Sequence, residues 1–222
     1  MKIKTIAISV TAFVLLGGVI GVQQYVSSQI TSKVQQEMPN ASGISASVPL
    51  ADVPSNLTSD SIKSADINIK SFALKESGTK TSLDISASSI SKAKPTLVGS
   101  LEVTATIPAS TITKASEFND AQIVGNTLQV SAGAGGMGTA LLIPKFSNNQ
   151  LYFELQSVSI FGNQIHASSL PADLQNQIKS RSQRSLTPPK GLKVKSVSLS
   201  SKGLSVRMSG NNIQLGNLGS GL

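Results

Sequence analysis

The residues that could perform chemistry in this chain are few and scattered. His166 is the only histidine and cysteine is absent, which excludes a disulfide scaffold, a thiolate metal site and a cysteine nucleophile. A lone histidine in a Gln-Ile-His-Ala strand is most often a surface or satisfied core residue. The acidic residues occur singly, without the pairing that glycoside hydrolysis or a metal site requires. The sequence therefore predicts a non-enzymatic protein without a metal or cofactor site.

One glycine-rich segment matches a nucleotide-binding pattern. Residues 133–138 satisfy G-x-G-x-x-G, but that fingerprint needs a strand before it, a helix after it and an acidic residue about 20 positions further on. The segment that follows, TALLIPKF, is expected to be extended and contains a proline. We interpret residues 133–138 as a loop.

The positive charge of the chain is concentrated in its last quarter. The net charge is +8, and no acidic residue follows Asp173. An anionic membrane surface or phospholipid headgroup is therefore a plausible partner, although a solvated basic face has the same composition. Nucleic acid is not expected, because aromatic residues that could stack on bases are missing from this region. The basic residues concerned are Lys179, Arg181, Arg184, Lys190, Lys193, Lys195, Lys202 and Arg207.

The N-terminal segment predicts export. After Lys2 and Lys4, the run from Ile6 to Val22 is apolar and uncharged, at the short end of the range for a transmembrane helix. No A-x-A cleavage site follows, so a retained anchor that comprises residues 1–28 is favoured over a cleaved signal peptide. The remaining residues, 29–222, are expected to form one domain on the outer side of the cell membrane.

An amphipathic helix is expected to continue outward from the anchor. Apolar residues recur every four positions from Val22 to Met38, with polar residues between them. Pro39 ends the pattern. The apolar side of such a helix must dock on the domain or on another copy of the chain.

From Ile44 onward the pattern predicts β-strands with one apolar face. Alternating residues indicate strands near 62–74, 83–87, 97–107, 123–130, 139–143, 151–160, 192–199 and 204–208, joined mostly by short turns. The parity of the apolar residues switches near Lys70 and near Lys195, which indicates a bulge in each of these strands. The predicted fold is α+β, a strongly coiled and mainly antiparallel sheet wrapped around one or two helices.

One helix is predicted to interrupt the sheet. Ser169 is a plausible N-cap and Pro171 suits the first turn. Leu174 and Ile178 lie on one side of the helix, and Lys179, Arg181 and Arg184 give it a basic end.

The C-terminal hairpin resembles a known family. It has a proline-rich start, two strands of alternating apolar residues and a turn that ends in glycine, and it closes with an apolar pair. The residues concerned are Pro188, Pro189, Gly191, Leu192, Val194, Val197, Leu199, Gly203, Leu204, Val206, Met208, Gly210, Ile213 and Leu215. This pattern resembles the C-terminal signature of the LmeA-like phospholipid-binding family of actinobacterial cell-envelope proteins. The resemblance implies a tubular or half-barrel lipid-binding fold, and a role in the maturation of mannosylated envelope lipids.

Two hypotheses follow. In the first, the domain binds phospholipid in an apolar groove and holds the anionic headgroup with cations. The groove residues would be Leu101, Val103, Leu128, Val130, Leu151, Phe153, Leu155, Leu174 and Ile178, and the headgroup residues Lys179, Arg181, Arg184 and Lys190. In the second, the protein is a structural or scaffolding component of the envelope whose interior is filled by its own side chains. The same alternation serves a filled core and an open groove.

Overall fold

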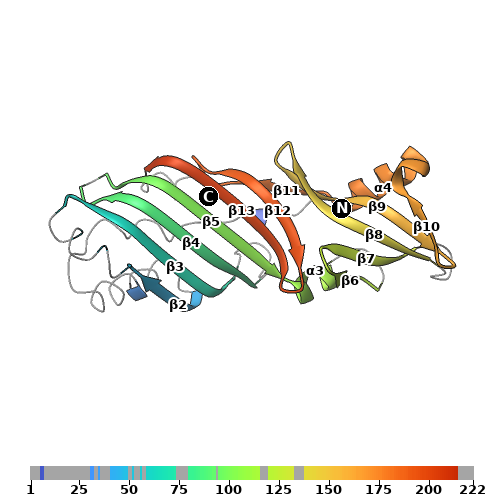
Figure 1. Ribbon diagram of the computed structural model, residues 1–222, viewed down its shortest axis with the longest axis horizontal. Coiled ribbons are helices and arrows are strands. Elements are labelled where there is room, and N and C mark those ends of the chain that lie inside the picture. The colour runs from blue at the N-terminus through green and yellow to red at the C-terminus, as the bar shows by residue number, and fades with distance from the viewer. Residues whose placement is uncertain are drawn as a thin grey trace. The chain divides into compact units, whose positions relative to one another are not determined.

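The computed structural model describes residues 6–7, 31–32, 35, 41–49, 52, 56, 59–73, 80–93, 95–115, 120–132 and 138–214. These residues form two mainly antiparallel sheets and a few short helices (Figure 1). The predicted sheet-dominated fold is confirmed at this level. The chain divides into two compact units, and each is described by itself. The first comprises Met1–Ile6, Thr106–Thr187 and Ser196–Val206, and the second Ala7–Ala105, Pro188–Lys195 and Arg207–Leu222.

The seven-stranded sheet has the order β1-β11-β9-β8-β7-β6, with β10 also paired to β9. Its strands are β1 (Ile6–Ala7), β6 (Gln122–Val124), β7 (Thr127–Ala132), β8 (Gly138–Ser147), β9 (Gln150–Ile160), β10 (Asn163–His166) and β11 (Arg184–Thr187). Tight turns join β6 to β7 and β8 to β9, as the sequence predicts. At the second turn Asn148 and Asn149 have φ of 52° and 57°, the left-handed conformation that asparagine tolerates well.

The six-stranded sheet has the order β12-β13-β5-β4-β3-β2. Its strands are β2 (Ala41–Ser47), β3 (Ser61–Ala73), β4 (Lys80–Ser91), β5 (Leu97–Pro108), β12 (Lys193–Ser200) and β13 (Gly203–Gln214). Along β3 and β4 the buried residues alternate with half-buried or exposed ones. One side of the sheet is therefore apolar and the other polar.

The two predicted changes of strand phase are present. In β3 the pairing with β4 shifts between Ile69 and Phe72, which keeps both of these side chains buried. In β12 the neighbouring residues Lys195 and Ser196 are both exposed, so the phase changes there as expected. A third shift, between Leu141 and Leu142 in β8, was not predicted.

The helices differ from the sequence-based prediction more than the strands do. Helix α3 (Ala109–Ala115) follows directly after Pro108 and was missed. The predicted helix is present as α4 (Ala172–Ser182), but Ser169 belongs to a short 3₁₀ helix, η4 (Ala167–Ser169), so Pro171 holds the N-cap position in its place. Arg184 lies beyond α4 as the first residue of β11.

Most of the predicted N-terminal anchor and amphipathic helix lies outside the described residues. Ile6 and Ala7 are extended rather than helical, whereas Thr31, Ser32 and Gln35 are helical. None of the helices among the described residues is long and apolar enough to cross a membrane. The membrane span, the boundary at residue 28 and the single domain stay predictions.

Three glycines of the C-terminal hairpin have steric reasons to be glycine. Gly191 has φ of 87° in a turn closed by a hydrogen bond from the Leu192 N–H to the Pro189 carbonyl. A Cβ on Gly210 would lie 2.3 Å from the Gly191 carbonyl oxygen, and one on Gly203 would lie 1.9 Å from the Ile107 carbonyl oxygen. These glycines therefore allow backbone segments to approach closely.

Replacing Gly203 by alanine should destabilise the fold strongly. The new Cβ meets backbone atoms of Ile107, and the φ of 135° is unfavourable for alanine. We expect a loss of about 2–5 kcal/mol, from backbone strain and overpacking together. Gly125→Ala is the control, because φ there is 61° but no atom lies within 4 Å of the added Cβ. Denaturant unfolding of both variants measures the difference, and equal losses would contradict the steric explanation.

Candidate functional site

The predicted groove residues on strands are buried. They are Leu101 and Val103 on β5, Leu128 and Val130 on β7, and Leu151, Phe153 and Leu155 on β9. The predicted strand phases are therefore confirmed. The two β5 residues belong to the second compact unit and the other five to the first.

The predicted groove residues on α4 do not follow this pattern. Leu174 is 39% exposed, Ile178 is half-buried, and α4 contains no fully buried residue. The prediction was therefore wrong for Leu174. The apolar stripe is short, and polar residues such as Gln175 and Ser182 hold the helix in place instead.

Polar contacts attach α4 to β9 and to the segment before it. The hydroxyl of Ser182 accepts a hydrogen bond of 2.9 Å from the Phe153 N–H. At the other end, the amide of Gln175 donates to the Ala167 carbonyl at 2.8 Å. The ammonium of Lys179 lies 4.5 Å from the ring centre of Tyr152 on β9, a cation–π contact. The last turn of α4 is thus fixed beside the first half of β9.

The predicted headgroup residues differ in exposure and in hydrogen bonding. Lys179, Arg181 and Lys190 are exposed, whereas Arg184 is half-buried. The guanidinium of Arg184 donates to the carbonyls of Arg181 and Gln183, at 3.0 and 2.8 Å, and so satisfies acceptors at the end of the helix. Arg184 therefore has a structural role at the end of α4. Lys190 belongs to the second unit and the other three residues to the first.

Elsewhere in the basic quarter, one charge is paired with an acid that is distant in sequence. The Nε of Arg207 on β13 lies 3.2 Å from a carboxylate oxygen of Glu102 on the neighbouring strand β5. Both side chains are about half exposed, so the pair contributes little stability, roughly 0–1 kcal/mol. It nevertheless reduces the local excess of positive charge that the sequence predicted.

Among the described residues, the apolar side of the six-stranded sheet contains one buried polar atom without a hydrogen-bond partner. Thr81 alternates with Leu83 and Ile85 on β4 and is 1% exposed. Its hydroxyl has no hydrogen-bond partner among the described residues. A buried unpaired hydroxyl costs about 1–3 kcal/mol and calls for an explanation. Sequence reasoning missed Thr81, although its spacing from Leu83 placed it on the apolar side.

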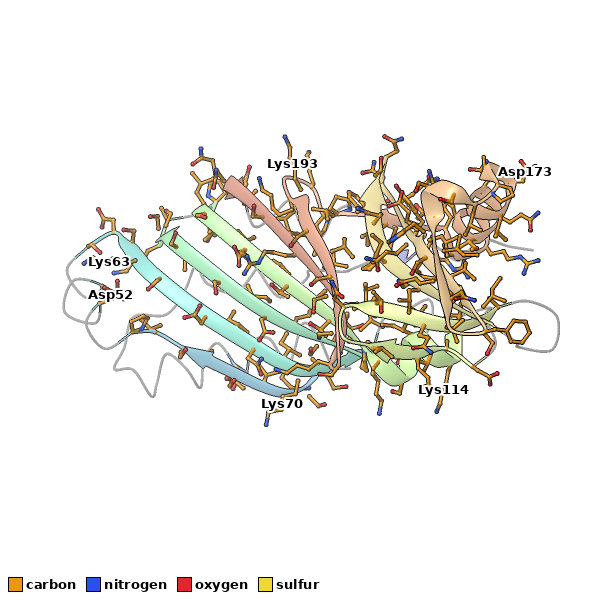
Figure 2. All side chains as sticks on the ribbon, turned by 45° about the vertical axis from the view of Figure 1, so that its right-hand side comes forward. Asp52, Lys63, Lys70, Lys114, Asp173 and Lys193 are labelled. Atoms are coloured by element: carbon orange, nitrogen blue, oxygen red, sulfur yellow. The ribbon has the colours of Figure 1, made fainter. Side chains whose placement is uncertain are left out.

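The polar side of the same sheet has a shallow cleft of about 260 Å³ over β2, β3 and β4. The Asn68 amide donates to Asp84, and the Ser86 hydroxyl donates to Asp66. These cross-strand pairs join neighbouring strands. Hydroxyl, amide and carboxylate groups line the cleft together with Ala46, Ile67 and Ile85, so it has the mixed polar and apolar lining of a surface depression. Figure 2 shows another pair of this unit, Lys63 beside Asp52, with 3.8 Å between the charged atoms.

Among the described residues, the other candidates from the sequence do not form a catalytic, nucleotide or metal site. His166 is exposed on β10. The segment from Gly138 is strand β8 rather than the helix that a dinucleotide site needs, while residues 133–137 lie outside the described residues. Within the described part of the chain, no three His, Cys, Asp or Glu side chains are placed to hold a metal ion together.

Comparisons with protein-family models, with curated proteins and with solved structures find no match to this chain.

Replacing Phe153 by alanine should cost roughly 3–5 kcal/mol if the ring is tightly packed, because Phe153 is buried on β9. Leu174→Ala is the control, and we expect a change within about 0.5 kcal/mol because this side chain is exposed. Thermal and denaturant unfolding give both values. A cost for Phe153→Ala far below this range would indicate that the interior around the ring is an open groove.

Proposed function

We propose that this chain is an exported, membrane-anchored phospholipid-binding protein of the cell envelope and that it is not an enzyme. In this proposal residues 6–22 stay in the membrane as the anchor. A strongly coiled sheet wraps around one or two helices and offers an apolar groove for acyl chains. A role in envelope lipid or lipoglycan maturation is part of the proposal through the resemblance to the LmeA-like family.

The observation that carries the proposal is the apolar side of the six-stranded sheet. On β3 and β4 its buried residues are aliphatic apart from Phe72 and Thr81, and none of them is charged. They are Ile62, Ala65, Ile67, Ile69, Phe72, Thr81, Leu83, Ile85, Ala87 and Ile90. Aliphatic side chains suit acyl chains, and a ligand pocket has few polar groups that orient the bound molecule. The Thr81 hydroxyl is covered by protein atoms, so the proposal requires a bound lipid to displace the residues over it. An ester oxygen of the phospholipid would then accept a hydrogen bond from this hydroxyl.

Exposed cations support the headgroup part of the proposal. Lys179 and Arg181 stand in the last turn of α4, and Lys190 stands in the turn before β12. Cations at a helix C-terminus are also favoured by the helix dipole, so their presence alone does not decide the question. The proposal requires in addition that they contribute to membrane binding.

A second candidate is a structural or scaffolding envelope protein with a filled interior. The near-complete burial of the apolar side chains favours it, since Ile69, Leu83 and Ile90 are 0% exposed. Under this alternative the Thr81 hydroxyl has no role. Valine has nearly the same shape, so Thr81→Val would then be neutral or stabilising.

Native mass spectrometry of the chain from Gln29 onward distinguishes the two candidates. We expect phospholipid to remain bound through purification, and Thr81→Val to lower the retained fraction without lowering the melting temperature. Ser82→Val, at the next and half-buried position, is the control and should retain lipid as the parent protein does. Absence of lipid from the parent protein, under conditions that preserve its fold, would favour the filled core.

Removing exposed cations should weaken binding to anionic vesicles. We expect the triple change Lys179→Ser, Arg181→Ser and Lys190→Ser to cost about 3 kcal/mol, roughly 100-fold in affinity, at low salt. The effect should shrink as salt screens the charges. Arg184 is retained because it binds carbonyls at the end of α4.

The control removes the same number of charges elsewhere, with Lys70, Lys80 and Lys114 changed to serine. All three are exposed, and Figure 2 shows Lys70 and Lys114 extending away from the ribbon. Cosedimentation of the chain from Gln29 onward with vesicles measures both variants. Equal losses would mean that net charge alone matters and would remove the headgroup residues from the proposal.

A further inference from the structure

The turn between β9 and β10 exposes two consecutive large apolar residues. Phe161 is 77% exposed, the highest value among the large apolar side chains that the structure describes, and Ile160 before it is 41% exposed. Both belong to the first compact unit. A single exposed apolar residue is ordinary on a protein surface, so the backbone and the surroundings of the turn decide whether this pair has a role.

The backbone of the turn is unsuited to phenylalanine. Phe161 has φ of 50° and Gly162 has φ of 81°, as in a two-residue turn with both residues left-handed. The β8–β9 turn of the same sheet has this geometry with Asn148 and Asn149, which tolerate it better than a bulky aromatic does. Asparagine at position 161 would therefore fold at least as well. A strained and exposed side chain of this kind indicates a requirement beyond folding.

Charged residues are absent from the turn and from the strand segments that adjoin it. The chain contains no Asp, Glu, Lys or Arg from Leu155 to Ala172, and none from Ala121 to Pro144. These ranges include β7, β10 and most of β8, and Gly138 at the start of β8 pairs with Ile160. Strands β8, β9 and β10 are therefore uncharged at the end that holds the turn. Two strands away from β9, the exposed Asp120 accepts a hydrogen bond of 3.2 Å from the Ser131 hydroxyl on β7, at the level of Ser159.

The charges on β8, β9 and β11 lie toward the opposite end of the sheet. Lys145 pairs with Tyr152 and Arg184 with Leu151, and Lys179 lies over the Tyr152 ring. At about 3.3 Å per residue, Tyr152 is roughly 30 Å along β9 from Phe161. The turn itself, with the adjoining ends of β8 and β10, can thus enter an apolar medium without carrying a charged side chain with it.

We propose that the Phe161 turn inserts into the interfacial region of a lipid bilayer and positions the seven-stranded sheet at the membrane surface. The inference rests on the proposed function for the choice of a membrane as the partner. Two side chains bury a few hundred Å², which is far below the roughly 1,200 Å² of a stable protein interface. A bilayer accepts a small convex turn, because lipids adapt to its shape.

A single tryptophan reports on this contact, since the chain has no Trp. The full chain carrying Phe161→Trp is reconstituted into phosphatidylcholine–phosphatidylglycerol vesicles with or without brominated acyl chains. We expect its emission to shift to shorter wavelength relative to the detergent-free unfolded chain, and brominated lipid to quench it strongly.

Val124→Trp is the matched control. Val124 is 50% exposed on β6 and pairs with Thr127, about 20 Å along the strands from the level of Ile160. The emission of tryptophan at this position should resemble that of a solvent-exposed indole, with several-fold weaker quenching. Solvent-like emission and weak quenching at position 161 as well would overturn the proposal. A shift at position 161 that needs no lipid and grows with protein concentration would assign the turn to contacts between copies, which also overturns it.

Phe161→Asn separates a membrane role from a folding role. We expect its melting temperature to equal or exceed that of the parent protein, because asparagine suits the left-handed backbone. A clear fall would show that the ring stabilises the fold and would contradict the inference. These readouts are independent of lipid retention, so a protein without bound lipid can still show quenching in the Phe161→Trp variant, and a lipid-binding protein can fail to show it.

Discussion

The structure depends on keeping the apolar residues of long strands on one side. Side chains alternate between the two faces of a strand, so a single phase error moves all later residues to the wrong face. In β3, which has 13 residues, the register shift between Ile69 and Phe72 prevents this error. A missing ladder hydrogen bond costs roughly 0.5–1.5 kcal/mol, whereas exposing Phe72 alone would cost about 1.5–3 kcal/mol. The bulge is therefore favourable.

The same alternation gives the six-stranded sheet one polar side and one apolar side. On the polar side, Asn68 and Asp84 or Asp66 and Ser86 join neighbouring strands by hydrogen bonds between side chains. On the other side, aliphatic residues leave the Thr81 hydroxyl without a partner among the described residues. Burial of one side is thus the main source of stability.

The seven-stranded sheet has a second asymmetry, along its strands. Helix α4 is held by Ser182 and Gln175 rather than by a buried apolar face, and its cations stand beside the first half of β9. At the other end β8, β9 and β10 are uncharged and carry Ile160 and Phe161 at the turn, while Asp120 lies beside β7 at the level of Ser159. Under the two proposals the cations would meet headgroup charge and the turn would make apolar contact with the membrane.

Local features of this protein could be predicted from its sequence alone. Alternation indicated the strands, the positions of two phase changes and the inward direction of Leu151, Phe153 and Leu155. The turn of the C-terminal hairpin was expected to end in Gly203, and this glycine has a φ of 135° at the start of β13. Such features depend on neighbours within a few residues, which the sequence shows directly.

Which distant residues meet was visible only in the folded chain. Arg207 pairs with Glu102, more than a hundred positions earlier, and Arg184 caps a helix instead of remaining free. Leu174 matched the apolar spacing of a helix but stays exposed, because a hydrogen bond between Ser182 and Phe153, rather than apolar packing, holds α4 beside β9. The exposure of Phe161 could not be inferred from its type, since an apolar residue beside Gly162 suits a buried strand end equally well. Burial and pairing depend on which strands become neighbours, and that is set by packing of the whole sheet rather than by local spacing.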